Sequence, residues 1–320
     1  MSTDTTTEQA TGKSAMNKAF WRVLPLIGLA YLFAYMDRVN VSFAAASMNG
    51  DLAFSATIYG LGGGLFFLGY ALFEIPSNLM LVRFGARKWI ARIMITWGLL
   101  SAAMMFVETP MQFYVLRFLL GVAEAGFYPG VIFYFAGWFP PCHRSRAVSR
   151  FFVFSPLASV AMGAMSGWLL GLDGNAGLHG WQWLFLVQGL PTVLVGLLVL
   201  KCLPDSPTTV TWLTQQEKDW IHTELVREQA RFAVPSVTSS GWAEVLHVRE
   251  LAIGAAAINT ISQIGAFVAP YGWGMAKDAT GSFQPALITL AFIALIIAAL
   301  LMLLRRQVSG RAAQPATATA

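Results

Sequence analysis

The chain has 320 residues, of which 56% are hydrophobic and 12% are charged, against about 25% charged residues in soluble domains. This composition, with a mean hydropathy of +0.60, excludes a soluble globular protein. It predicts an all-α polytopic membrane protein, because the apolar runs lack the alternation of β-barrel strands. The net charge of +5 does not indicate nucleic-acid binding, since the basic residues lie between the apolar runs. We expect no metal, no cofactor and no enzyme, since no nucleophile, base and oxyanion group converge.

The pattern of apolar runs divides the chain into five parts. Residues 1–19 lack an apolar core and are expected to be a disordered cytoplasmic tail, and 307–320 a second one. A six-helix bundle over 20–203, a cytoplasmic linker over 204–250 and two further transmembrane helices over 251–306 lie between them. The eight expected spans, each long enough to cross a bilayer, are 24–48, 56–80, 88–107, 112–137, 150–171, 182–203, 251–275 and 284–304.

The positions of Lys and Arg predict the orientation in the membrane. Both tails and the loops after the second, fourth and sixth spans are basic. The first, third and fifth loops contain no Lys or Arg, and the seventh contains only Lys277. Because cytoplasmic loops carry the excess of Lys and Arg, we expect both termini in the cytoplasm and the chain in the inner membrane.

The first span contains two adjacent charges, Asp37 and Arg38, close to its middle. A charge at that depth costs on the order of 3 kcal/mol, so it faces a bundle interior or a wet cavity. Either the two side chains pair and hold helices together, or they form a substrate and proton site.

Glycines recur every four residues in two spans. Gly60 and Gly64 lie in the second span, and Gly163, Gly167 and Gly171 lie in the fifth. Small residues at this spacing let another helix approach closely. Both glycine faces are therefore predicted to be helix-packing surfaces.

A basic turn joins the second and third spans and contains Arg83, Gly85, Arg87 and Lys88. It marks the cytoplasmic side by its charge. The turn can also be interpreted as a cytoplasmic gate, because a short basic turn can bond the ends of neighbouring helices when the cytoplasmic side of a transporter closes.

The fourth span holds a second buried charge group. Arg117 and Glu124 are seven residues apart, which places them on one helical face about 10 Å apart. Burial favours the neutral form of a carboxyl, and a neighbouring cation favours the charged form. Glu124 can therefore exchange a proton when a substrate anion arrives. Pro129 and Gly130 favour a break beyond it.

The linker begins with a helix signal. Thr214 and Glu217 form a capping box, and the charged and apolar residues that follow, to about Arg231, are typical of an amphipathic helix lying on the membrane surface.

Several segments resemble the anion:cation symporter branch of the major facilitator superfamily. They are MDRVNVSFA, LGYALFEIPSNLMLVRFGARKWIARIMITWGL, RFLLGVAEAGFYPG, GWQWLFLVQGLP, LPDSP and WLTQQEKDW, between about Asn17 and Ile221. The resemblance implies a transporter with two pseudo-symmetric halves of six helices. Members of this branch import organic acids such as tartrate, sugar acids, phthalate and hydroxyphenylacetate together with protons.

The resemblance implies a role for each charge of the first and fourth spans. Asp37 and Glu124 match the proton-coupling acids, and Arg38 matches the arginine that meets the substrate carboxylate. Tyr35 and Asn40 are further candidates for substrate binding.

The same resemblance assigns coupling and gating residues. Arg117 matches an arginine linked to coupling, and Gln188, which we interpret as a packing residue, stands where relatives often have Glu. The turn at residues 83–88 matches the cytoplasmic gate. Asn78 and Val82 depart from the Gly and Asp common in that motif, which weakens its charge pairing.

Only two spans follow the linker. The segment IGAAAINTISQIGAFVAPYGWGMAKDATGSF resembles the eleventh helix and the loop after it, so the region of helices seven to ten is missing. Asn259 and Gln263, one turn apart, are the polar remnants of the second half's substrate site.

These observations predict proton-coupled symport of an organic carboxylate, namely a sugar acid, a dicarboxylate or an aromatic acid. The expected partners are the anion, protons and the lipid bilayer. Alternating access needs two halves, so self-association is expected to complete the cavity. The alternative is a non-transporting remnant or a membrane binding protein.

Overall fold

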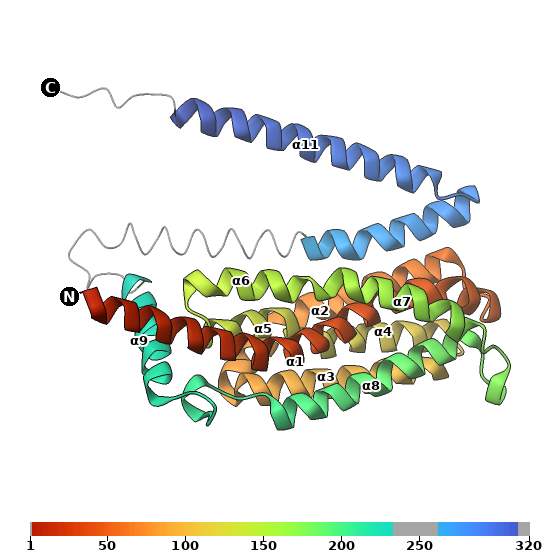
Figure 1. Cartoon of the computed structure of the whole chain (residues 1–320). Helices are drawn as coiled ribbons and strands as arrows, with labels where there is room; N and C mark the ends of the chain where they lie inside the picture. Colours follow the sequence, from red (N-terminus) through yellow and green to blue (C-terminus); the bar gives the residue numbers. More distant parts are fainter. Residues whose placement is uncertain (1, 233–261, 313–320) are drawn as a thin grey trace.

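The apolar runs form long helices that lie side by side (Figure 1). The computed structural model describes residues 2–232 and 262–312, which are mostly helical. Residues 262–280 form one helix. The other helices are α1 (Ser2–Asp51), α2 (Ala56–Phe84), α3 (Ala86–Ala103), η1 (Met104–Phe106), α4 (Pro110–Glu124), α5 (Phe127–Ala136), α6 (Pro141–Phe152), α7 (Phe154–Leu170), η2 (Asn175–Gly177), α8 (Gly180–Cys202), η3 (Pro207–Thr209), α9 (Gln215–Phe232) and α11 (Gln284–Ala312).

Within residues 2–232 and 262–312, six helical segments are long and apolar enough to cross a membrane, and they coincide with the first six predicted spans. Two of them are broken: α4 continues into α5, and α6 continues into α7. The helix at residues 262–280 and the apolar part of α11, Gln284–Leu300, follow the linker. The predicted all-α fold is therefore confirmed. Residues 251–261 of the seventh predicted span lie outside the described residues.

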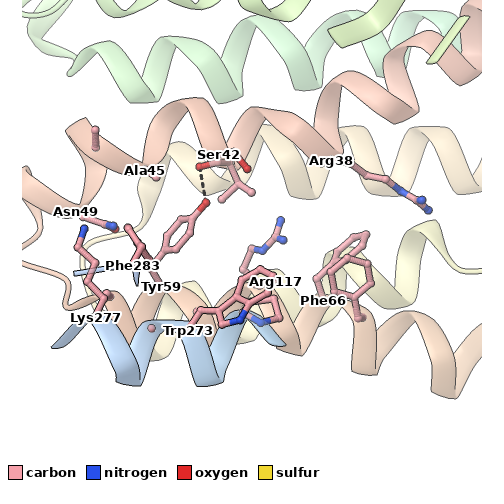
Figure 2. Close-up of a pocket in the computed structure, with 18 residues that line it drawn as sticks. Arg38, Ser42, Ala45, Asn49, Tyr59, Phe66, Arg117, Trp273, Lys277 and Phe283 are labelled. Atoms are coloured by element: carbon pink, nitrogen blue, oxygen red, sulfur yellow. Dashed lines mark hydrogen bonds between the residues drawn. The ribbon is translucent and has the colours of Figure 1, made fainter. Parts of the chain in front are cut away.

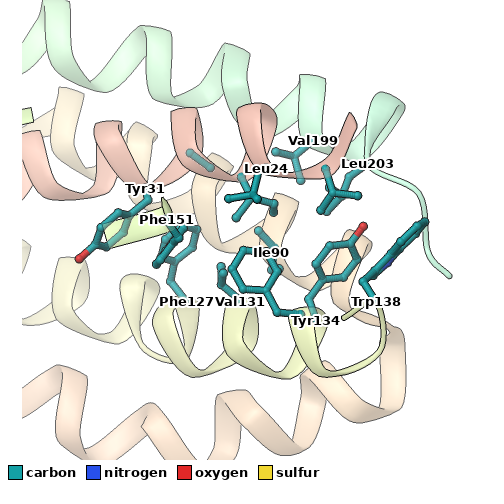
Figure 3. Close-up of a cluster of buried hydrophobic side chains, with 14 of the residues drawn as sticks. Leu24, Tyr31, Ile90, Phe127, Val131, Tyr134, Trp138, Phe151, Val199 and Leu203 are labelled. Carbon is teal, nitrogen blue, oxygen red and sulfur yellow. The ribbon is translucent and has the colours of Figure 1, made fainter. Parts of the chain in front are cut away.

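Two clusters of buried apolar side chains fill the bundle, one toward each end. The first includes Leu24, Ile90 and Val199 (Figure 3), and the second includes Met48 and Trp181. Buried polar side chains lie at or next to the boundary between the clusters. They are Asp37 and Asn40 on α1, Ser101 on α3, Arg117 and Glu124 on α4, and Gln188 and Thr192 on α8. The bundle therefore carries a polar layer between two apolar ones.

The first residues of the chain differ from expectation, because the segment predicted to be a disordered tail over 1–19 is helical from Ser2 onward. Distant residues bury one face of it. Ala15 and Ala19 have no exposed surface, and Gly12 lies against the indole ring of Trp220 on α9. Tertiary packing of this kind stabilises helices that sequence propensity alone does not.

The predicted capping box at the start of α9 is confirmed. Thr214 Oγ1 accepts a hydrogen bond from the Glu217 N–H at 3.3 Å, and Glu217 Oε2 accepts from the Thr214 N–H at 2.9 Å. The Glu217 carboxylate also accepts from Ser14 Oγ at 2.7 Å and from Lys18 Nζ at 2.9 Å. The amphipathic helix is thus bound to α1. Linker residues 233–250 lie outside the described residues.

The two predicted glycine faces have different outcomes. Gly60 and Gly64 of α2 lie against the backbone carbonyls of Pro270 and Phe267 in the helix 262–280. A side chain at either glycine would clash with that backbone, so this prediction is confirmed. In α7, the β position of Gly163 lies 3.9 Å from the Phe43 ring of α1, and that of Gly167 has no atom among the described residues within 4 Å. Among the described residues, no backbone of another helix approaches these α7 glycines as closely as the helix 262–280 approaches α2.

We expect the contact between α9 and α1 to depend on pH through Glu217. Burial raises the pKa of this carboxyl, but hydrogen bonds from Lys18, Ser14 and Thr214 outweigh burial and lower the pKa from 4.5 to about 2. A carboxyl whose pKa falls on folding contributes stability above its unfolded pKa. Docking of α9 is therefore fully stabilised above about pH 4.5 and weakens as the pH falls toward about 2.

Hydrogen exchange of the α9 amides measures this docking. Near neutral pH, Glu217→Gln is expected to lower the free energy of protection of the α9 amides by about 1.5–3 kcal/mol, the range for hydrogen bonds to charged groups. As the pH falls below about 4.5, the protection of α9 should fall in the wild type but change little in Glu217→Gln, which has no carboxyl at this position. The control is Glu224→Gln, on the same helix, where Glu224 pairs with Arg227. Equal losses in both variants would contradict the assignment.

Candidate functional site

The two adjacent charges of the first span point to different neighbours. Asp37 accepts a hydrogen bond from the Ser101 hydroxyl of α3, whereas Arg38 pairs with Glu124 of α4. Successive residues of a helix are rotated by about 100°, so one faces the bundle interior and the other faces α4. The interpretation in which Asp37 and Arg38 pair with each other is not what the structure shows.

The ion pair between Arg38 and Glu124 is short. Glu124 Oε1 lies 2.6 Å from Arg38 Nη2 and accepts from Nε at 2.7 Å. The Tyr70 ring lies beneath the guanidinium, 5.4 Å from its centroid. The Glu124 side chain is 1% exposed, but that of Arg38 is 37% exposed. The arginine therefore faces open space on the side away from its acid.

The backbone break after Glu124 positions this carboxylate. α4 ends at Glu124, and Gly126 has φ 85°, in the left-handed region. The Ser77 hydroxyl of α2 donates to the Ala125 carbonyl at 2.6 Å, which satisfies a backbone group freed by the break. The break was expected at Pro129 and Gly130, but it occurs earlier. Pro129 lies in the first turn of α5, where a helix tolerates proline.

Arg117 lies on the same helix as Glu124, as predicted, but interacts with α2. Its Nε donates to the Gly62 carbonyl at 3.4 Å, and its guanidinium lies 4.9 Å from the centroid of the Phe66 ring. Arg117 is buried within the protein. It is a cation held by a carbonyl and an aromatic face.

A cavity of about 700 Å³ connects these cations. Figure 2 shows Arg117 and Tyr59 pointing into the space between α1 and the helix 262–280. The Tyr59 hydroxyl donates to the Val41 carbonyl of α1 at 3.0 Å. The charged side chains among the described lining residues are Arg38, Arg117 and Lys277, with no carboxylate. Aromatic lining comes from Tyr59, Phe66, Phe67, Trp273 and Phe283.

A smaller cavity of about 170 Å³ lies on another side of Arg38. Tyr70, Glu74 and Tyr128 line it together with Gln263 of the helix 262–280. Gln263, predicted to bind substrate, is thus placed beside Arg38. Asn259 lies outside the described residues.

The other predicted site residues lie deeper in the bundle. Asn40 is buried and donates to the Leu184 carbonyl at 3.4 Å, while Gln188 donates to the Phe33 carbonyl at 2.9 Å. Both are held by backbone of another helix, which agrees with a packing role for Gln188. Tyr35 packs beside Tyr31, with ring centroids 6.2 Å apart. Neither Tyr35 nor Asn40 is among the described residues that line the large cavity.

Sequence reasoning missed Tyr59, Trp273 and Lys277 as lining residues. Lys277 was considered only as a topology marker. Its placement depends on the docking of the helix 262–280 against α2, which the glycines at 60 and 64 permit. Those glycines were the available signal, because they indicated a close helix partner without identifying it.

The basic turn at residues 83–88 lies at the end of the bundle that also holds α9. Gly85 has φ 87° and separates α2 from α3. Arg87 Nη2 lies 2.8 Å from Asp205 Oδ2 in the loop after α8, while Arg83 lies over the Phe84 ring and Lys88 is exposed. Arg87 thus ties the turn to the loop after α8, and the gate role of residues 83–88 stays a prediction.

The opposite end has its own contact between α2 and the helix 262–280. Asp278 accepts hydrogen bonds from the backbone N–H groups of Ala56 at 3.0 Å and Thr57 at 2.7 Å. Hydrogen bonds from Thr57 and Ala56 lower the pKa of the Asp278 carboxyl to about 2. A carboxylate at a helix N-terminus is favoured by the helix dipole. This contact lies beside the large cavity, whose lining includes Ala56 and Lys277.

Comparison with known protein families places the fold. The family model of the Major Facilitator Superfamily matches residues 27–306, most of the chain. The chain belongs to the Major Facilitator Superfamily. Its apolar helices are those of a multi-pass membrane protein of this superfamily, and the resemblance seen in the sequence is confirmed at the level of the family.

Relatives in the Major Facilitator Superfamily cover about two thirds of the chain. It is 51% identical over 219 residues to the "Putative metabolite transport protein NicT" of Pseudomonas putida, covering 68% of this chain and 50% of that protein. It is 49% identical over 215 residues to a "Putative tartrate transporter" of Agrobacterium vitis, covering 67% and 48%. The chain spans about half the length of the curated relatives it matches. These names are those of transporters, in agreement with the expectation of no enzyme.

A solved structure gives the same fold. A bacterial homologue of the human lysosomal transporter Spinster, in an inward-facing and occupied conformation, superposes with a TM-score of 0.54 at 22% identity. The match covers 57% of this chain and 44% of that one. The six-helix arrangement of the Major Facilitator Superfamily is therefore present in this chain.

Substitution of Gly126 tests the break that positions Glu124. A β-carbon there would collide with the Ser77 side chain, and the left-handed φ of 85° adds strain of about 1–2 kcal/mol for a non-glycine residue. Gly126→Ala is therefore expected to lower the thermal unfolding temperature in detergent.

The matched control is Gly137→Ala, at the end of α5. Gly137 has a right-handed φ of −83°, and its β position is 3.6 Å from the nearest atom, the Tyr134 carbonyl oxygen. This variant should unfold at the wild-type temperature. Equal effects of the two substitutions would show that the break at Gly126 stores no strain.

Proposed function

We propose that the chain acts in proton-coupled symport of an organic carboxylate. The observation that carries the proposal is the large cavity, whose described lining holds Arg38, Arg117 and Lys277 and no acidic side chain. Cations within a membrane are retained where they bind an anion or pair with an acid. Guanidinium groups suit a carboxylate because they donate two parallel hydrogen bonds.

The lining also constrains the size and the apolar character of the substrate. A volume of about 700 Å³ is within the usual range for small-molecule sites. Tyr59, Phe66 and Trp273 offer ring faces, so the cavity suits a sugar acid or an aromatic acid that stacks on them. The resemblance to a tartrate transporter supports the carboxylate class.

Coupling to protons follows from competition for Arg38. One oxygen of Glu124 pairs with Arg38, and the other, Oε2, is buried without a hydrogen-bond partner among the described residues. A substrate carboxylate that binds Arg38 displaces Glu124. A buried carboxylate without its cation is costly unless it takes up a proton. Anion binding and proton uptake at Glu124 are therefore linked, with Asp37 as the second acid of the layer.

Alternating access would use contacts at both ends. Arg38 borders both the large and the small cavity, so it can meet an anion from either side. Arg87 with Asp205 holds one end, and Asp278 with α2 holds the other. With the basic end in the cytoplasm, as the Lys and Arg pattern favours, both termini would be cytoplasmic in the inner membrane.

Transport by this chain needs a further wall around the site. Arg38 is 37% exposed, and the apolar side chains Leu287, Phe292 and Leu295 of α11 are largely exposed. A second copy of the chain is the source that we propose for this wall, since transport by rocking requires two opposing bundles.

Removal of the cation at position 38 tests the anion site. Arg38→Gln is expected to weaken binding of sugar acids or aromatic acids by about tenfold to a hundredfold, the usual worth of a charged hydrogen bond. Titration calorimetry on the purified chain measures this. Lys201→Gln, an exposed position at the end of α8, is the control and should bind as the wild type does. Unchanged affinity in a folded Arg38→Gln variant would rule out the assignment.

Removal of the acid at position 124 tests the coupling. In proteoliposomes, Glu124→Gln is expected to abolish proton uptake on adding the anion. It should leave anion binding equal or stronger, because Glu124 no longer competes for Arg38. Glu108→Gln, in the exposed loop before α4, is the control.

The same experiment separates transport from binding alone. Proton uptake that survives in Glu124→Gln would contradict the coupling role. Anion binding without any flux in the wild-type chain would identify a membrane binding protein instead of a symporter.

A further inference from the structure

A separate cavity of about 710 Å³ lies at the end of the bundle that holds the basic turn. Three segments from different parts of the sequence enclose it: residues 9–20 of α1, α6, and Trp220 of α9. It shares no lining residue with the cavity around Arg38. The symport proposal does not use it.

The charge of this cavity is one-sided. Its described lining includes Lys13, His143, Arg146 and Arg150, and it includes no Asp or Glu. Ser14 also lines it, but the carboxylate that Ser14 contacts, Glu217, already binds Lys18. The basic side chains of the cavity therefore lack an acidic partner within it.

The arrangement on α6 concentrates this charge. His143, Arg146 and Arg150 follow one another at three and four residues, which places them on one face of the helix. The sequence of α6, PCHRSRAVSRFF, contains no acidic residue. Arg146 and Arg150 are like charges four residues apart, and such pairs destabilise a helix. An anion in the cavity would remove this cost.

Other lining groups fit a phosphate with an apolar neighbour. His143 Nδ1 is buried and has no hydrogen-bond partner among the described residues. Gln9 and Asn17 add neutral amide donors. Met16, Phe20 and Trp220 provide apolar surface, and the Arg150 guanidinium lies 4.6 Å from the centroid of the Phe20 ring.

The position along the membrane favours a ligand at the interface. Phe20 lies one turn before Leu24, where the apolar run of α1 begins. Basic side chains just outside a span lie at the level of lipid headgroups. The cavity is therefore open to a phosphate attached to a lipid and to a phosphate in solution.

We propose that this cavity binds a phosphate group through Lys13, Arg146 and Arg150, and that an anionic phospholipid headgroup or a soluble phosphate supplies it. The bound group bridges α1 and α6 beside α9, and so strengthens the contact of these three helices.

The test uses the full chain in nanodiscs of phosphatidylcholine, with and without phosphatidylglycerol. In the double variant Lys13→Gln with Arg146→Gln, the affinity for phosphatidylglycerol, measured by native mass spectrometry, is expected to fall about 30-fold, for two cations near the surface. The control is Lys201→Gln with Lys218→Gln, which removes the same charge at the same end of the bundle outside the cavity. It should retain phosphatidylglycerol.

A second arm adds inorganic phosphate to the chain in phosphatidylcholine alone and measures the unfolding temperature. If phosphate raises the unfolding temperature of the wild type but not that of the double variant, the cavity binds a soluble phosphate. Without any ligand, the double variant should unfold at or above the wild-type temperature, because it removes like-charge repulsion. This result also shows that it is folded. If neither phosphatidylglycerol nor phosphate binds, or if the control loses binding equally, the proposal is overturned.

Discussion

The ion pair between Arg38 and Glu124 is the interaction on which the rest of the bundle depends. Neither charge is tolerable alone at that depth in a membrane. The pair fixes α1 against α4, and the break at Gly126 sets where α4 ends and hence where the acid lies. Apolar clusters lie on either side of this layer. A polar site in the middle of an apolar bundle is stable only because its charges are placed together in this way.

Much of this site could be predicted from the sequence, for a physical reason. Buried charges are so costly that Arg38, Arg117 and Glu124 were indicated by their position in apolar runs alone. The sequence did not identify the partner of each charge. Asp37 and Arg38 are adjacent in the chain, but the rotation of the helix turns their side chains toward different neighbours. The position of the break was also misplaced. Proline is the stronger signal in a sequence, but Pro129 fits the first turn of α5, and Gly126 takes the left-handed conformation.

The failures of prediction lie where distant residues determine local structure. Residues 2–19 are largely polar, yet they are helical, and α9, about 200 residues later, packs against one face of them. The large cavity depends on a helix beyond the linker, so Trp273 and Lys277 had no local signal of function. Gly60 and Gly64 did carry information, but a small-residue face shows only that a partner exists. In α7 the same glycine spacing meets the Phe43 side chain of α1, and no backbone of another described helix approaches it closely.

The Asp278 contact with the start of α2 has a consequence for how the two sides of the membrane differ. Its pKa of about 2 means that this carboxylate keeps its charge in any ordinary external acidity. With this end on the exterior, as the Lys and Arg pattern favours, an acidic exterior would not loosen it by protonating Asp278. In the proposed cycle the proton would act at Glu124, and the Asp278 contact would resist the ion that drives transport. Opening on that side would then require α2 and the helix 262–280 to separate without a change in the protonation of Asp278. Proton uptake at Glu124 would be a separate event at another place in the bundle.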